Sequence, residues 1–150
     1  MALANRRSYT FDAALQLKDA GLVASSAAAQ VSASNQILDV GANPFSGVAV
    51  IDVSAIEIAS DNEEYDILIQ GSNSASFASG IENLAQLNLG ATEVRQGGAQ
   101  DSVTGRYEVP FINVQADTVY RYIRAYTVVA GSIATGINWR GFVGRLPDGF

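Results

Sequence analysis

Hydrophobic and polar residues alternate in short runs along most of the chain. The longest run extends from Thr118 to Ala130 and ends at Gly131. It is rich in Val, Ile, Thr and Tyr and contains no proline, which is typical of a β-strand. Because successive side chains of a strand point to opposite faces, one face carries Tyr120, Tyr122, Arg124, Tyr126 and Val128, and the other carries Val119, Arg121, Ile123, Ala125, Thr127 and Val129. Apolar bulk on both faces predicts a central strand that is covered on each side.

The tyrosine face of this strand has two interpretations. An arginine between tyrosines can lie flat on their rings while its guanidinium reaches a carboxylate or a carbonyl. A packed sheet core explains the face without any ligand. The alternative is an aromatic platform that binds a sugar or a base.

Other segments give weaker strand signals between turn residues, and the predicted strands cover residues 36–40, 47–59, 65–70, 84–89, 107–113 and 133–143. The apolar phase slips inside the second of these, which predicts a β-bulge near Ser54–Ile56. Pro110 predicts an edge or bulged strand, because proline cannot donate to a sheet. Residues 11–18 fit either a strand or a helix, and residues 22–31 are predicted to be extended.

About eight strands separated by turns predict an all-β fold, an antiparallel β-sandwich of the jelly-roll type. We expect a single jelly-roll domain over residues 11–150, preceded by an extended N-terminal arm over residues 1–10. The chain shows no repeat of the length that marks solenoids or propellers.

Charge and hydropathy narrow the possible partners. The net charge of −6 argues against nucleic acid, because phosphate binding favours a basic surface. No apolar run approaches the roughly 20 residues of a membrane span, and Met1–Arg7 lacks the apolar core of a signal peptide. We therefore expect no nucleic-acid partner and no membrane partner. Residues 1–38 carry +1, residues 39–108 carry −9 and residues 109–150 carry +2, so the two ends are better placed to meet an acidic partner.

The residues offer little catalytic chemistry. The absence of His and Cys excludes the commonest general base, a serine triad and thiolate metal sites. The acidic run Asp61–Asp66 is the best candidate for a hard cation, but it lacks the glycine and distal glutamate of a calcium loop, which favours a solvated turn. Asp52, Glu57, Glu82 and Glu108 could in principle pair as in a glycosidase, although the sequence does not pair them. We predict a non-enzymatic protein with no catalytic residues, no cofactor and no metal site.

Several segments, in their order along the chain, resemble a family of tailed-phage capsid cement (decoration) proteins. These are LKDAGLVAS at Leu17–Ser25, IDVSAIEI at Ile51–Ile58, LIQGSN at Leu68–Asn73, YIRAYTVVAG at Tyr122–Gly131 and ATGIN at Ala134–Asn138. Each motif is short, and their order carries the resemblance, which extends over residues 11–145.

The resemblance implies a jelly roll that sits on the outer surface of an HK97-type shell and stabilises the mature DNA-filled head. The implied partners are the major capsid protein and the chain itself, as a homodimer or homotrimer at capsid symmetry axes. The implied location is the outer capsid surface of the virion, after assembly in the bacterial cytoplasm. The predicted capsid contacts lie in the arm and on the basic C-terminal side, because positive charge stands out on an acidic protein. They are Asn5, Arg6, Arg7, Tyr9, Arg140 and Arg145. Deleting residues 1–10 is expected to abolish decoration and leave the fold intact.

A carbohydrate-binding jelly roll is the alternative. The segment Tyr65–Asn73 resembles the strand followed by Gly-Ser-Asn that occurs in discoidin-like modules. Such a site would combine exposed aromatic rings with polar groups. The third possibility, an enzyme such as a glycosidase or lyase, has no supporting constellation of residues.

Overall fold

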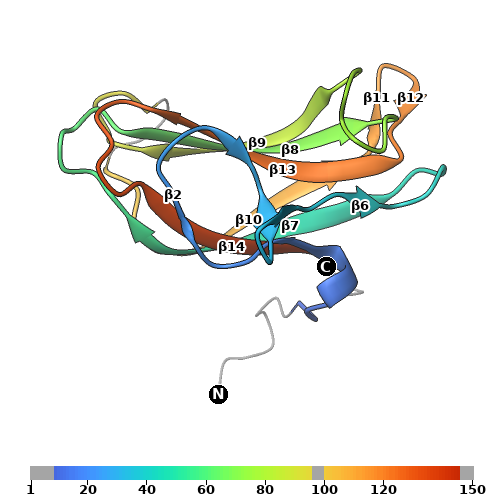
Figure 1. The fold of residues 1–150 in the computed structure, drawn as a ribbon, viewed down its shortest axis with the longest axis horizontal. Helices are drawn as coiled ribbons and strands as arrows, with labels where there is room; N and C mark the ends of the chain where they lie inside the picture. The colour runs from blue at the N-terminus through green and yellow to red at the C-terminus, as the bar shows by residue number, and fades with distance from the viewer. Residues whose placement is uncertain (1–8, 96–99, 146–150) are drawn as a thin grey trace.

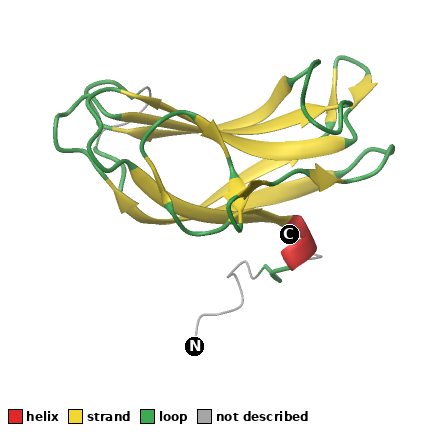
Figure 2. Ribbon diagram, viewed as in Figure 1, coloured by secondary structure: helices red, strands yellow, loops and turns green. Residues whose placement is uncertain are grey.

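The computed structural model describes residues 9–95 and 100–145. Over these residues the chain forms two antiparallel β-sheets stacked face to face (Figure 1), with one short 3₁₀ turn, η1 (Ala13–Leu15), outside them (Figure 2). The predicted all-β antiparallel sandwich is confirmed. Its jelly-roll connectivity stays a prediction.

Each sheet is built around two long central strands. Sheet A has the order β1 (Gln16–Lys18), β14 (Ile137–Gly144), β7 (Ser46–Ile56) and β10 (Gly105–Ile112), and β2 (Leu22–Val23) also pairs with β14. Sheet B has the order β3 (Ala27–Ala28), β13 (Tyr122–Ala130), β8 (Glu64–Ser72) and β9 (Glu82–Gly90), and β6 (Leu38–Asp39) also pairs with β13. Two small hairpins pair β4 (Gln30–Val31) with β5 (Ser34–Asn35), and β11 (Val114–Gln115) with β12 (Thr118–Val119).

The core lies between the sheets and is filled by alternate residues of the long strands. Ile51 of β7, Ile67 and Ile69 of β8, Ile123 of β13 and Trp139 of β14 are all fully buried there. Burying each large apolar side chain stabilises the fold by about 1.5–3 kcal/mol relative to leaving it exposed. Period-two burial in both sheets is therefore the main source of stability.

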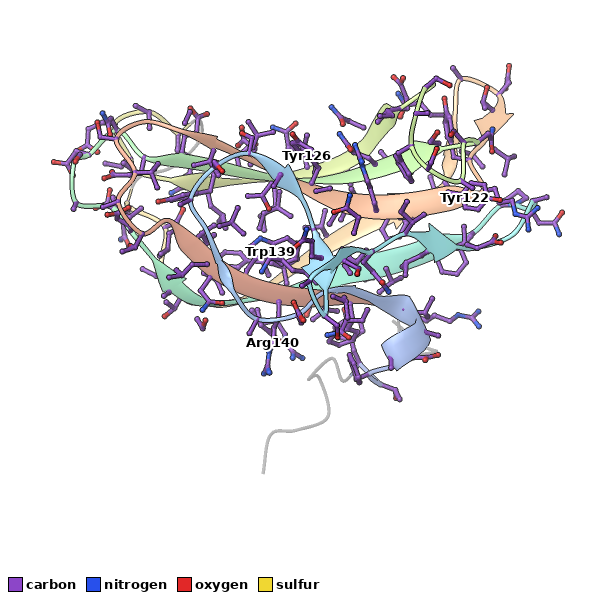
Figure 3. The ribbon with its side chains drawn as sticks, in the orientation of Figure 1. Tyr122, Tyr126, Trp139 and Arg140 are labelled. Atoms are coloured by element: carbon purple, nitrogen blue, oxygen red, sulfur yellow. The ribbon has the colours of Figure 1, made fainter. Side chains whose placement is uncertain are left out.

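One hydrogen bond crosses the core from one sheet to the other. The indole Nε1–H of Trp139 donates to Oγ1 of Thr127 over 3.1 Å, and the two side chains are 0 % and 1 % exposed. Figure 3 shows Trp139 between the two layers. The hydroxyl satisfies the one polar group that this large side chain carries into the core.

Lys18 links the short strand β1 to the neighbouring strand β14 through hydrogen bonds. Its Nζ donates to the carbonyl oxygens of Asp19, Gly21 and Trp139 over 2.9, 2.9 and 2.8 Å. An ammonium group has three donors, so all of them are used. This explains how a lysine that is only 6 % exposed is accommodated at the side of the sandwich.

Most of the predicted strand features are found. Ser54 is the extra residue of a bulge in β7, because Val53 and Ala55 pair with adjacent residues of β14, Trp139 and Asn138. Pro110 lies in β10, at the edge of sheet A. Residues 11–18 contain both alternatives, a 3₁₀ turn followed by a strand, and residues 22–31 form short extended pieces.

The predicted strand 118–130 is interrupted. The chain leaves the β12 hairpin and enters sheet B only at Tyr122, because the N–H groups of Tyr120 and Arg121 bond to Asn113 and Asn73 instead. β13 is central, as predicted, but only one of its faces is packed in the core. Cover on both faces was expected, and that expectation is wrong, since the tyrosine face stays half-buried.

Candidate functional site

The outer face of sheet A combines aromatic and charged side chains. Alternation along β14 sends Trp139 into the core and turns Arg140 and Phe142 outward. In Figure 3, Arg140 points away from the sandwich, on the side opposite Trp139. The side chain of Arg140 is 69 % exposed. This face is therefore accessible and cationic where Arg140 projects from it.

The N-terminal segment crosses this face. The ring of Tyr9 covers a second apolar cluster formed by Val48, Val50 and Phe142, and its hydroxyl donates to the carboxylate of Glu108 over 2.8 Å. A Cβ atom added to Gly144 would lie 2.9 Å from the Tyr9 ring, so the ring packs directly on the backbone of β14. Tyr9 is thus held on this face by both packing and a hydrogen bond.

Phe11 adds a second ring to the same face. It meets Phe142 edge to face, with 5.4 Å between ring centroids and an interplanar angle of 85°. Phe11 nevertheless remains 54 % exposed. Because aromatic residues are enriched at protein–protein interfaces, Phe11 is a candidate contact residue.

Asp52 organises the charges on this face. Arg106 of the neighbouring strand donates to both carboxylate oxygens of Asp52, over 2.7 and 2.9 Å, and Nε of Arg140 lies 4.0 Å from the same carboxylate. Hydrogen bonding from Arg106, with a smaller contribution from the charge of Arg140, holds the pKa of Asp52 below its usual value. One carboxylate thus faces two guanidinium groups, and it interacts more weakly with Arg140 than with Arg106.

Two hollows flank this charge cluster. One has a volume of about 310 Å³ and is lined by Tyr9, Phe11, Gln16, Lys18, Asp52, Arg106, Arg140, Gly141 and Phe142. The other has a volume of about 500 Å³ and lies between Ser54, Gly105 and Asn138, sharing the three charged residues with the first. The arginines shared by the two hollows can bind a carboxylate, and the first hollow, with its aromatic lining, can receive an apolar side chain.

The structure brings together part of the predicted capsid-contact set. Tyr9 and Arg140 line the same hollow, and Arg145 is exposed one residue beyond β14. Asn5, Arg6 and Arg7 lie outside the described residues. Sequence reasoning missed Phe11, Phe142, Arg106 and Asp52 as part of this face. The alternation of β14 identifies Phe142 as a neighbour of Arg140, but the pairing of β7 with β10 has no local signal.

The outer face of sheet B carries a different arrangement, centred on Arg124 of β13. Its guanidinium lies over the ring of Phe77 at 4.5 Å and near the ring of Tyr126 at 5.3 Å. Its Nε donates to Oε1 of Gln70 over 2.9 Å, and Nε2 of Gln70 donates to Oδ1 of Asn83 over 3.0 Å. Arg124 is thus held by two rings and a chain of amides.

Glu57 and Glu82, two of the acidic groups considered from the sequence, are hydrogen-bonded locally. Oε1 of Glu57 accepts the three consecutive backbone N–H groups of residues 134–136 over 2.8, 3.0 and 3.1 Å, which lower its pKa. Glu82 accepts from Gln115 over 3.3 Å. Asp61, Glu93 and Asp101 bring carboxylate oxygens within 4.8 Å of one another, and all three are exposed. An exposed acidic cluster of this kind does not by itself mark a metal site.

No protein-family model matches the chain, and no curated protein matches it in sequence. Among the described residues, no helix has the length and hydrophobicity needed to cross a membrane.

Proposed function

We propose that this protein is a capsid decoration protein that attaches to the outer surface of an HK97-type shell through the outer face of sheet A. The observation that carries the proposal is the convergence of Tyr9 and Arg140, two predicted contacts far apart in the sequence, on one hollow. Phe11, which is 54 % exposed and meets the buried ring of Phe142 edge to face, adds aromatic surface to it.

Charge favours this face as the attachment surface. The charged residues that line it, Lys18, Arg106 and Arg140 against Asp52 and Glu108, leave one net positive charge. The whole chain has a net charge of −6, so the rest of the molecule is strongly acidic. A partner with acidic side chains would be steered to this face and repelled by the others.

The mechanism is mechanical. A stiff sandwich that bridges neighbouring capsomers adds buried area where the shell holds together least well, and stable interfaces bury roughly 1,600 Å². Self-association as a homodimer or homotrimer at symmetry axes would let each copy hold the others on the shell. The virion surface is then the place of action, and the major capsid protein is the partner.

The direct test is co-expression with the HK97-type major capsid protein encoded in the same genome. The expected result is that the chain sediments with assembled shells in a density gradient and appears as added density on their outer surface. A chain that stays at the top of the gradient, or a genome without such a capsid gene, rejects the proposal.

Two variants locate the attachment surface. Removing residues 1–8, which keeps Tyr9 over Val48 and Val50, is a cleaner deletion than removing residues 1–10. This deletion and Arg140→Gln are both expected to weaken shell binding. Arg121→Gln is the matched control, because it removes the same charge from an arginine that is 49 % exposed and paired with Asp39 beside sheet B.

A further inference from the structure

Arg124 differs from three other described arginines, each of which lies beside a carboxylate. Arg106 and Arg121 each make two hydrogen bonds to a carboxylate, and Arg140 lies 4.0 Å from one. Arg124 is half-buried, yet none of the carboxylates in the described part of the chain lies within ion-pair distance of it. Placing a cation partly out of water without a counter-ion is unfavourable, and burial lowers the pKa of the Arg124 guanidinium.

The guanidinium is oriented before any ligand arrives. Phe77, which is 5 % exposed, lies against it, and Tyr126 lies near it on the same strand. Gln70, which is 8 % exposed, accepts a hydrogen bond from Nε of Arg124 and donates one to Asn83. The two terminal nitrogens make no hydrogen bond to any described residue. They form the side of the guanidinium that matches a carboxylate with two parallel hydrogen bonds.

Apart from Arg124 itself, the side chains in the row of Arg124 and in the next row are neutral and rich in amides. Sheet register places Arg124, Gln70 and Asn83 in one row across three strands, and Tyr126, Leu68 and Gln86 in the next. Asn83, Gln86 and Asn88 of the edge strand β9 are all exposed, and Gln86 donates to Asn88. Amide groups offer both donors and acceptors, which sugar hydroxyls need, and a tyrosine ring can pack against the C–H face of a sugar.

We propose that the outer face of sheet B binds an acidic sugar, with the sugar carboxylate on the terminal nitrogens of Arg124 and its hydroxyls on the amides of Asn83 and Gln86. Tyr126 lies beside the sugar ring and the carboxylate supplies the missing counter-ion. This site is separate from the attachment surface, which lies on the opposite sheet, so it does not depend on capsid binding. A decoration protein that uses both faces could hold a shell on one side and touch a glycan on the other.

A peptide carboxylate fits the arrangement less well than a sugar does. An extended acidic peptide has few groups that match a two-dimensional array of side-chain amides, whereas a sugar carries hydroxyls around its ring. The acidic net charge of the protein acts over a distance of only about 8 Å at physiological salt. The local contacts of Arg124 therefore decide whether an anion binds.

The test is an NMR titration of the ¹⁵N-labelled full chain with two matched probes, methyl β-glucuronide and methyl β-glucoside, at physiological salt. These probes differ only at C6, which is a carboxylate in the glucuronide and a hydroxymethyl group in the glucoside. Shifts of the Arg124 Nε–H and of the Asn83 and Gln86 side-chain amides are expected with the glucuronide. Hydrogen bonds to charged groups contribute enough for the glucuronide to bind about tenfold or more tightly than the glucoside.

Variants separate the arginine from general charge. Arg124→Met keeps the unbranched stem between the rings and is expected to reduce glucuronide binding to the level of glucoside. Arg124→Lys keeps the charge without the planar fork and is expected to lose most of the affinity as well. Arg121→Met removes an exposed arginine that already has a carboxylate partner and should bind like the wild type. Asn83→Ala tests the amide array at an exposed position if both Arg124 variants unfold.

Three results would overturn the assignment. The first is equal binding of glucuronide and glucoside. The second is glucuronide binding that survives in Arg124→Met or, if the arginine variants unfold, in Asn83→Ala. The third is binding of a short polyglutamate peptide as tightly as the glucuronide, which would make the site a general carboxylate site. Shell binding is measured separately, so failure here leaves the capsid proposal standing, and the reverse also holds.

Discussion

Replacing Thr127 by Val tests the hydrogen bond that joins the two sheets. Valine has nearly the same shape as threonine and fits a strand equally well. The change removes the acceptor of the Trp139 indole N–H, which lies 3.1 Å from Oγ1 in a region with no exposed surface. A buried donor left without a partner costs about 1–3 kcal/mol. This is a large fraction of the roughly 5–15 kcal/mol by which a domain is typically stable.

The assay is urea unfolding followed by the emission of the one tryptophan in the chain, with far-ultraviolet circular dichroism as a second probe. Thr127→Val should lower the midpoint without changing the slope of the transition. Thr118→Val, at an exposed position of β12, is the matched control and should change stability by less than about 0.5 kcal/mol.

A second background isolates the hydrogen bond from packing. In a Trp139→Phe chain the donor is absent, so Thr127→Val should cost little there, and the coupling between the two changes should equal most of the loss. Circular dichroism replaces fluorescence for these variants. If Thr127→Val behaves like Thr118→Val, or costs the same in both backgrounds, the hydrogen bond does not stabilise the sandwich.

Two further changes test loop contacts. The pKa of Glu57 is lowered by the N–H groups of residues 134–136, so its contribution to stability is present above its unfolded pKa and is lost as pH falls through the folded value. Glu57→Gln should therefore lower the melting temperature at about pH 7 and match the wild type at about pH 2. A difference in melting temperature that stays constant with pH would contradict this. Gly136→Ala should destabilise the fold more than Gly80→Ala does. Both glycines have positive φ, +91° and +62°, but only at Gly136 would the new Cβ meet a neighbouring atom, the carbonyl oxygen of Val23 at 2.0 Å. Equal melting temperatures of the two variants would refute the close contact.

The sequence predicts the strands well, because period two is a local property. The bulge at Ser54 follows from a change of apolar phase within one strand, and the edge position of Pro110 follows from its missing donor. The interruption at Tyr120 and Arg121 could not be predicted. It depends on Asn113, across the β11–β12 hairpin, and on the distant Asn73, which accept the N–H groups that a continuous strand would use.

Functional roles on the two outer faces of the sandwich are equally hard to predict from local sequence. Arg124 and Arg140 both occupy outward positions on long strands, and nothing in their immediate sequence separates their roles. Their environments differ because Asp52 comes to Arg140 from β7, whereas Gln70 and Phe77 come to Arg124 from β8 and the loop after it. An arginine that shares a carboxylate and is mostly exposed suits an adaptable contact with a large partner. An arginine stacked on a buried phenylalanine ring, oriented by an amide and left without a counter-ion suits a small anionic group that must approach in one direction.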